Sequence, residues 1–137
     1  ERRIARMDFG PLIYIDDDED DRMLFQEAIE ELFPKLPVES YENGPSFLKR
    51  LSKDISNLPK LIFVDLNMPV VSGMECLKRI RTNTHFAKIP VIMYSTSSSR
   101  EDHTKCLDLG ADMFVTKSRS YDELKKQLTD IINTHLF

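Results

Sequence analysis

Five short apolar runs alternate with five amphipathic segments, and this alternation limits the possible folds more than any other feature of the chain. The runs cover residues 12–15, 38–41, 61–64, 91–94 and 113–115, the second being the weakest because it contains Glu39. Apolar runs of this length without polar alternation are typical of strands that are covered on both faces. The chain of 137 residues is long enough for one domain with an ordinary core.

The segments between and after the runs have helical spacing. Apolar residues recur at intervals of three and four in 23–33, 47–51, 74–81 and 124–136, and a further such segment ends at Gly110. Pro34 ends the first segment, and Ser98 with Glu101 resembles a capping box, so the fourth helix is expected to begin at Ser98 or Ser99. A strand followed by a helix, five times over, predicts an α/β domain: a doubly wound parallel sheet of five strands with helices on both faces.

Polar residues stand where the predicted strands end. Asp16 and Asp17 follow the first run, Asp65 the third, Ser95 the fourth and Lys117 the fifth. Ligands of such sheets bind beyond the carboxyl ends of the strands, so these side chains are expected to converge. Three close carboxylates raise one another's pKa unless a cation neutralises them, and Mg²⁺ prefers such oxygen ligands, with Mn²⁺ a possible substitute. A carboxylate can also form an aspartyl phosphate, whose oxygens a hydroxyl and an amine would stabilise.

The rest of the acidic stretch IDDDEDDR is expected to be structural. Residues 18–21 are predicted to lie in a loop and in the first turn of a helix, where acids interact favourably with free N–H groups. An EF-hand would use Asp16, Asp18, Asp20 and Glu27, but the glycine that its sharp turn needs is replaced by Asp21. Cys76 and Cys106 form no metal-binding spacing and are expected to be reduced, buried helix residues.

Taken together, these motifs resemble the CheY-like receiver domains of response regulators over residues 12–136. The resemblance rests on the acidic pair, the DLNMP motif at 65–69, Gly73, Ser95, the GAD motif at 110–112 and Lys117. It implies the strand order 2-1-3-4-5. It also implies that Asp65 is phosphorylated, that Asp17, Asp65 and the backbone carbonyl of Asn67 ligate Mg²⁺, and that Asp16 acts largely through water.

The same resemblance assigns roles to the later strand ends. Ser95 would hydrogen-bond a phosphoryl oxygen, Lys117 would pair with another, and Phe114 would be an aromatic switch that turns inward. Two positions depart from the usual family pattern. Thr96 stands where a smaller residue is common and would narrow access to the site. Ser118 replaces the proline after the lysine, so the peptide bond between them is expected to be trans, or a strained cis bond held by its surroundings.

The implied function is that of a two-component phosphorelay regulator rather than an enzyme acting on a separate substrate. A sensor histidine kinase or phosphotransfer protein would supply the phosphoryl group. The output would be a protein target, or a dimer of the chain, that binds the surface of the fourth helix, the fifth strand and the last helix. The sequence of residues 96–118 resembles that of stand-alone receivers that work with phytochrome-like kinases. Residues 1–10 are expected to be an extension, and 11–137 the receiver.

Other functions remain open at this point. A degenerate receiver would serve as a constitutive binding module, and a phosphatase of the haloacid-dehalogenase type would use Asp16 as nucleophile and Asp18 as general acid. The net charge of −4 does not suggest a nucleic-acid surface. No apolar run approaches the roughly 18 residues of a membrane span, and a cytoplasmic protein is expected.

Overall fold

The strands and helices alternate as the apolar pattern predicts. The computed structural model describes residues 10–53 and 56–137. In that part of the chain the elements are β1 (Leu12–Ile15), α2 (Glu19–Leu32), β2 (Val38–Tyr41), α3 (Gly44–Lys53), β3 (Leu61–Val64), α4 (Gly73–Thr82), β4 (Val91–Ser95), α5 (Arg100–Asp108), β5 (Met113–Thr116) and α6 (Tyr121–Leu136). The strands form one parallel sheet in the order β2-β1-β3-β4-β5, which confirms the expected fold.

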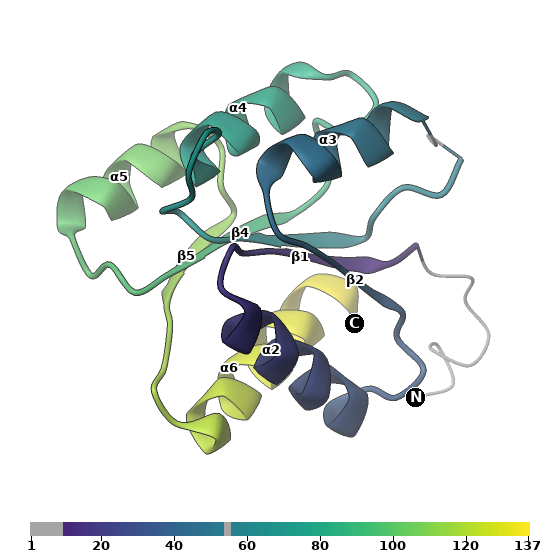
Figure 1. The fold of residues 1–137 in the computed structure, drawn as a ribbon, viewed down its shortest axis with the longest axis vertical. Helices are drawn as coiled ribbons and strands as arrows, with labels where there is room; N and C mark the ends of the chain where they lie inside the picture. The colour runs from purple at the N-terminus through teal and green to yellow at the C-terminus, as the bar shows by residue number, and fades with distance from the viewer. Residues whose placement is uncertain (1–9, 54–55) are drawn as a thin grey trace.

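The sheet separates two helical layers, with α3, α4 and α5 on one face and α2 and α6 on the other (Figure 1). Side chains of β1 pack toward both helical layers, because successive side chains of a strand point to opposite faces of the sheet. Ile13 and Ile15 pack in the core under the first layer, and Leu12 and Tyr14 pack in the core over the second. The central strands β1, β3 and β4 are buried throughout, whereas the edge strands β2 and β5 are partly exposed.

Each of the five described helices begins after a side chain that accepts a hydrogen bond from the first turn. The N-caps are Asp18 for α2, Ser72 for α4, Ser99 for α5 and Ser120 for α6, and at α3 the Asn43 side-chain oxygen accepts from the Ser46 N–H. At α5 the Ser99 hydroxyl accepts from the Asp102 N–H over 3.2 Å. The helix therefore begins at one of the two expected serines, but the expected capping pair of Ser98 and Glu101 is wrong.

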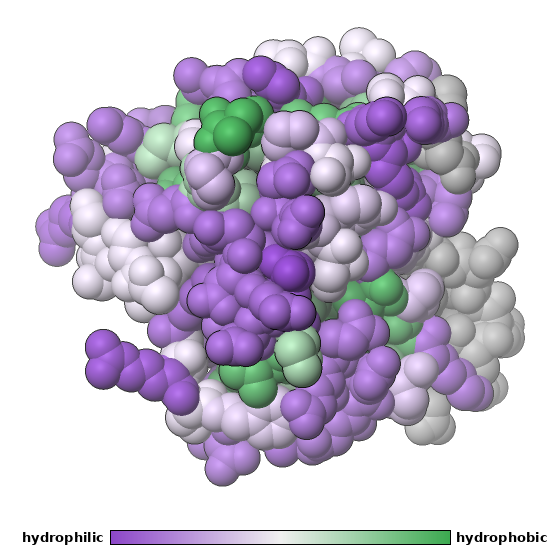
Figure 2. All heavy atoms as spheres, in the orientation of Figure 1, coloured by the Kyte–Doolittle hydropathy of each residue, from purple (hydrophilic) through white to green (hydrophobic). Residues whose placement is uncertain are grey.

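The face seen in Figure 2 is mostly hydrophilic, with small separate hydrophobic patches. Among the described residues the large hydrophobic side chains that lie exposed are Met23, Leu24, Val70 and Leu107. No described helix is both long and apolar enough to cross a membrane. Both cysteines are buried and unpaired with each other, as predicted. The predicted extension falls mostly on residues outside the described ranges, although Gly10 is described and buried.

Candidate functional site

The two central strands bring three carboxylates together, as the sequence predicts. Strands β1 and β3 pair in register, and their ladder continues for one step because the Asp65 N–H donates to the Ile15 carbonyl over 2.8 Å. Asp16 and Asp17 follow the same end of β1. One carboxylate oxygen from each of Asp16, Asp17 and Asp65 lies within 4.8 Å of the others. Asp16 and Asp65 are buried and Asp17 is exposed, so the cluster opens to solvent on one side.

Asp65 is held in an environment that disfavours its charge. Its residue is only 7% exposed. Burial is the main cause that raises the pKa of Asp65 to about 6, and the negative charges of Asp16 and Asp17 raise it further, while Lys117 opposes them. The Asp65 carboxylate therefore gains from a cation that offsets its charge.

Asp16 is fully buried, yet three donors surround its carboxylate. The Tyr14 hydroxyl donates to Oδ2 over 2.5 Å, the Lys117 ammonium donates to the same oxygen over 2.6 Å, and the Asp18 N–H donates to Oδ1 over 3.0 Å. Burial first, and then the charge of Asp16, raise the pKa of Tyr14, which keeps its hydroxyl protonated as a donor. These bonds explain how a charged carboxylate is accommodated at the end of a buried strand.

Lys117 lies between the carboxylates, but it does not contact all of them equally. Its Nζ is 2.6 Å from Asp16 Oδ2, 2.7 Å from Asp21 Oδ2 and 3.6 Å from Asp65 Oδ1. Burial alone would lower the pKa of Lys117, but the bonds to Asp16 and Asp21 raise it overall. The Lys117–Ser118 peptide is trans, the first of the two expected forms.

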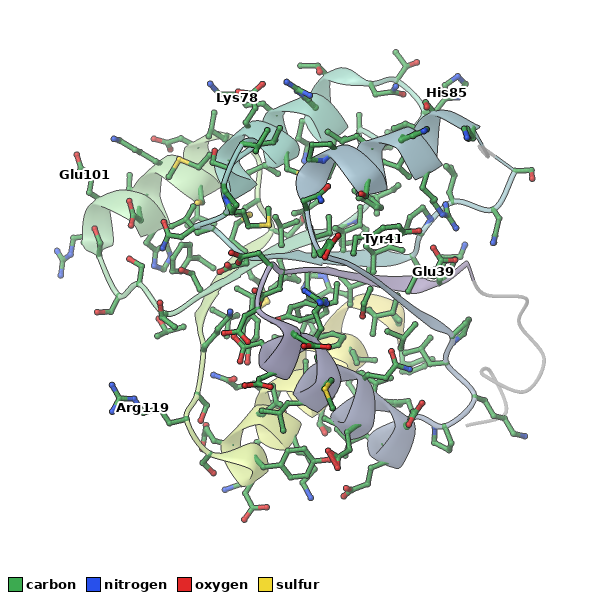
Figure 3. The ribbon with its side chains drawn as sticks, viewed as in Figure 1. Glu39, Tyr41, Lys78, His85, Glu101 and Arg119 are labelled. Carbon is green, nitrogen blue, oxygen red and sulfur yellow. The ribbon has the colours of Figure 1, made fainter. Side chains whose placement is uncertain are left out.

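The remaining predicted residues stand around this cluster. Ser95 is fully buried at the end of β4, where its hydroxyl accepts from the Ser97 N–H over 3.1 Å. Thr96 follows it and is exposed, and Asn67 is exposed in the loop after β3. These positions are compatible with the predicted roles, which stay predictions. Arg119 extends into solvent from the connection between β5 and α6 (Figure 3).

Phe114 of β5 is partly buried and packs against the core beneath α3, α4 and α5. Its ring stacks on that of the exposed His103 of α5, with centroids 5.2 Å apart and an angle of 13° between the planes. The predicted switch residue therefore touches both the core and the fourth of the helices expected from the sequence. Its movement on activation stays a prediction.

The site fits a hard divalent cation. All three of its side-chain donors are carboxylates, and one of them is exposed, which leaves room for water as well. Mg²⁺ and Mn²⁺ accept such oxygen donors and commonly keep part of their water shell. The EF-hand alternative fails, because residues 12–15 form a strand and Asp20 and Glu27 lie within α2.

Two residues of the site were missed by the sequence reasoning. The sequence predicts that Asp21 lies in the loop or first turn of a helix, but its carboxylate also accepts a hydrogen bond from Lys117. For Tyr14 the sequence predicts only a place in an apolar run. A signal for Tyr14 was present, because residues two apart on a strand share a face and a tyrosine there could reach Asp16. No pattern in the sequence indicates that Asp21 binds Lys117, because several other carboxylates were equally plausible partners for the lysine.

Comparison with known proteins agrees with this geometry. The family model of the response regulator receiver domain matches residues 12–129. The chain is 24% identical over 124 residues to chemotaxis protein CheY1 of Helicobacter pylori, covering 90% of this chain and 98% of CheY1. It is 33% identical over 91 residues to response regulator Rcp1 of Synechocystis, and the match covers 66% of this chain and 54% of Rcp1. It is 32% identical over 108 residues to chemotaxis protein CheV1 of H. pylori, and that match covers 75% of this chain and 33% of CheV1. The chain thus spans only about a third of CheV1 and about half of Rcp1.

Solved structures show the same fold. The phosphorylated cyanobacterial phytochrome response regulator RcpA superposes with a TM-score of 0.85 at 26% identity, over 93% of this chain and 94% of RcpA. The Mn²⁺-bound form of response regulator Rcp1 gives 0.80 at 26% identity, over 90% and 92%. None of these matches supports the phosphatase alternative. From the family match, the fold and the acidic site together, the chain belongs to the response regulator receiver domains of two-component signalling.

Proposed function

We propose that this chain takes up a phosphoryl group on Asp65 from a phosphohistidine of a sensor histidine kinase or phosphotransfer protein. The observation that carries the proposal is the position of Asp65. Its carboxylate clusters with those of Asp16 and Asp17, within 4.8 Å of each, and lies 3.6 Å from the Lys117 ammonium. Burial, and then the negative charge of Asp16, raise the pKa of Asp65 to about 6. A cation that shares the charge of Asp65 would therefore relieve an unfavourable environment and keep the carboxylate ionised, which is the form that attacks phosphorus.

In the transfer, a carboxylate oxygen of Asp65 attacks phosphorus while the bond from phosphorus to the imidazole nitrogen breaks. The electron pair of that bond stays on the imidazole, and the product is an aspartyl phosphate. A divalent cation, which we propose is Mg²⁺ with Mn²⁺ able to substitute, would be held by Asp17, Asp65 and the Asn67 carbonyl, with Asp16 acting through water, and would offset the charge on the carboxylate and phosphoryl oxygens.

Two side chains at neighbouring strand ends would receive the phosphoryl oxygens. Lys117 starts 3.6 Å from Asp65 Oδ1, so a short movement of its flexible side chain brings the ammonium to a phosphoryl oxygen. Ser95, buried at the end of β4, would donate a hydrogen bond to another oxygen. Thr96 lies exposed directly after it and would restrict the approach of water and donors. Slow hydrolysis of the acyl phosphate would reset the protein, which is a signalling domain and not an enzyme acting on separate substrates.

The output would pass through α5, β5 and α6. Reorientation of Ser95 toward the phosphoryl group would open space into which Phe114 turns, and its stacking on His103 would then be lost. This change would alter a surface that a protein target, or a second copy of the chain, can recognise. Since RcpA is a phytochrome response regulator by name, a phytochrome-like kinase is the first donor to test. A cytoplasmic location stays a prediction.

The decisive experiment is the intact mass of the protein after incubation with acetyl phosphate. The native chain should gain one phosphoryl group with Mg²⁺ or Mn²⁺ and none with EDTA, and Asp65→Asn should gain none. Asp108→Asn, a change of the same charge at an exposed residue of α5, should behave like the native chain. An adduct that survives in Asp65→Asn and disappears in Asp16→Asn would contradict the proposal. No adduct in any variant would favour a constitutive binding module.

A further inference from the structure

The Asp21 carboxylate contacts the site without belonging to its cation cluster. It projects from the first turn of α2, and its Oδ2 accepts a hydrogen bond from Lys117 Nζ over 2.7 Å. The three carboxylates that share a possible cation position are Asp16, Asp17 and Asp65, among the described residues. Asp21 is thus a second anion for Lys117, placed on the α2 side of the ammonium.

The distances show where Lys117 is held. The ammonium hydrogen-bonds Asp16 and Asp21, but 3.6 Å to Asp65 exceeds the 2.7–3.2 Å that is usual for such a bond. The Lys117 side chain is only 9% exposed, so few water molecules are available to replace a lost partner. The Asp21 side chain is 34% exposed and is better able to accept water when the lysine leaves.

We infer that Asp21 is a positioning residue that holds Lys117 away from the acceptor until a phosphoryl group competes for the ammonium. The inference rests on the proposed function, because it concerns the lysine that would bind the phosphoryl oxygen. When a cation shares the charge of Asp16, the attraction of Asp16 for the ammonium weakens, and Asp21 becomes the main group that a phosphoryl oxygen must displace. Asp21 therefore sets how easily Lys117 moves to the acceptor.

The surroundings of Asp21 allow this exchange. A cavity of about 30 Å³ lies beside the ion pair. Its lining includes the polar residues Asp21, Tyr94, Lys117 and Ser118 as well as apolar side chains. That volume matches one water molecule, which needs two to four polar partners. A water molecule there can solvate the Asp21 carboxylate after Lys117 has moved, so that the movement leaves no unsatisfied charge.

Beryllium fluoride tests the inference, because with Mg²⁺ it mimics a phosphoryl group on a carboxylate without covalent chemistry. Asp21→Asn should bind it about three to ten times more tightly than the native chain, since a charged hydrogen bond to the lysine is lost from the resting state. Asp20→Asn makes the same change of charge in the same turn and is not bound to Lys117, so it should change the affinity by less than twofold. In a Lys117→Met background, Asp21→Asn and Asp20→Asn should be equivalent.

A second readout needs neither metal nor phosphoryl mimic. In the metal-free protein, the ¹⁵N-detected signal of the Lys117 ammonium should be protected from exchange with water in the native chain and in Asp20→Asn, and less protected in Asp21→Asn. Equal beryllium fluoride affinities of Asp21→Asn and Asp20→Asn would overturn the role of Asp21 while leaving the proposed function intact. Failure of the native chain to bind beryllium fluoride or accept phosphate would overturn both.

Discussion

Replacing Asp65 with Asn should stabilise the metal-free protein above pH 6. Burial, and then the charges of Asp16 and Asp17, raise the pKa of Asp65 from 3.8 to about 6 on folding. Between these two pH values the folded state retains a proton that the unfolded state has lost. Stability therefore falls as the pH rises through this window and stays lower above it. A change of this size corresponds to about 3 kcal/mol. Because asparagine stays neutral and has nearly the same shape, Asp65→Asn should recover up to that amount.

Urea unfolding in EDTA at several pH values measures this effect. The stability difference between Asp65→Asn and the native chain should be small near pH 4 and should grow to about 2–3 kcal/mol by pH 7. Asp108→Asn, an exposed carboxylate of α5, should show little pH-dependent difference. Adding Mg²⁺ should reduce the advantage of the variant, because a cation that binds the native fold stabilises it. A difference that is the same at pH 4 and pH 7 would refute the reasoning.

Substitutions at three further positions test the loop after β3 and the support of the acidic cluster. Val70 has a φ of 67° and is 94% exposed. Val70→Gly should therefore relieve backbone strain without losing packing, and raise the free energy of unfolding by about 1 kcal/mol. Val70→Ala keeps a Cβ and should raise the free energy of unfolding by less. A Cβ on Gly73 would lie 2.3 Å from the Asp65 carbonyl oxygen, so Gly73→Ala should lower unfolding stability by at least about 2 kcal/mol and weaken Mg²⁺ binding in a titration. Tyr14→Phe removes a donor from buried Asp16 and should cost about 1–3 kcal/mol in urea unfolding, and much less in an Asp16→Asn background.

The fold and most of the site could be read from the sequence because both depend on strong, local patterns. The run at 61–64 had to be a buried strand, and a parallel sheet brings Asp65 to the same edge as Asp16. The partner of Lys117 could not be read in this way. Asp21 and Asp65 differ by less than an ångström in their distance from the ammonium, and that difference depends on how α2 is placed against the sheet.

The contact of Phe114 with His103 could not be predicted from the sequence either. This contact depends on how α5 is oriented over the edge strand. A rotation of that helix by about 100° about its axis would present another side chain to the ring. The residue at which α5 begins could not be chosen from the sequence alone for a similar reason. Adjacent serines both suit an N-cap, and only the backbone geometry selects Ser99.

The lysine that offsets the acidic cluster is 101 positions away from Asp16 and belongs to the connection after the last strand. A ribosome adding about 5–20 residues per second makes Asp65 several seconds before it makes Lys117. During that interval the growing chain carries all three acids without their own ammonium. A proton or a dissolved cation can offset the charge of those acids during that interval, when the pairing of β1 with β3 brings them together. The ionic composition of the surrounding solution should therefore affect how the nascent chain folds, before the protein is complete.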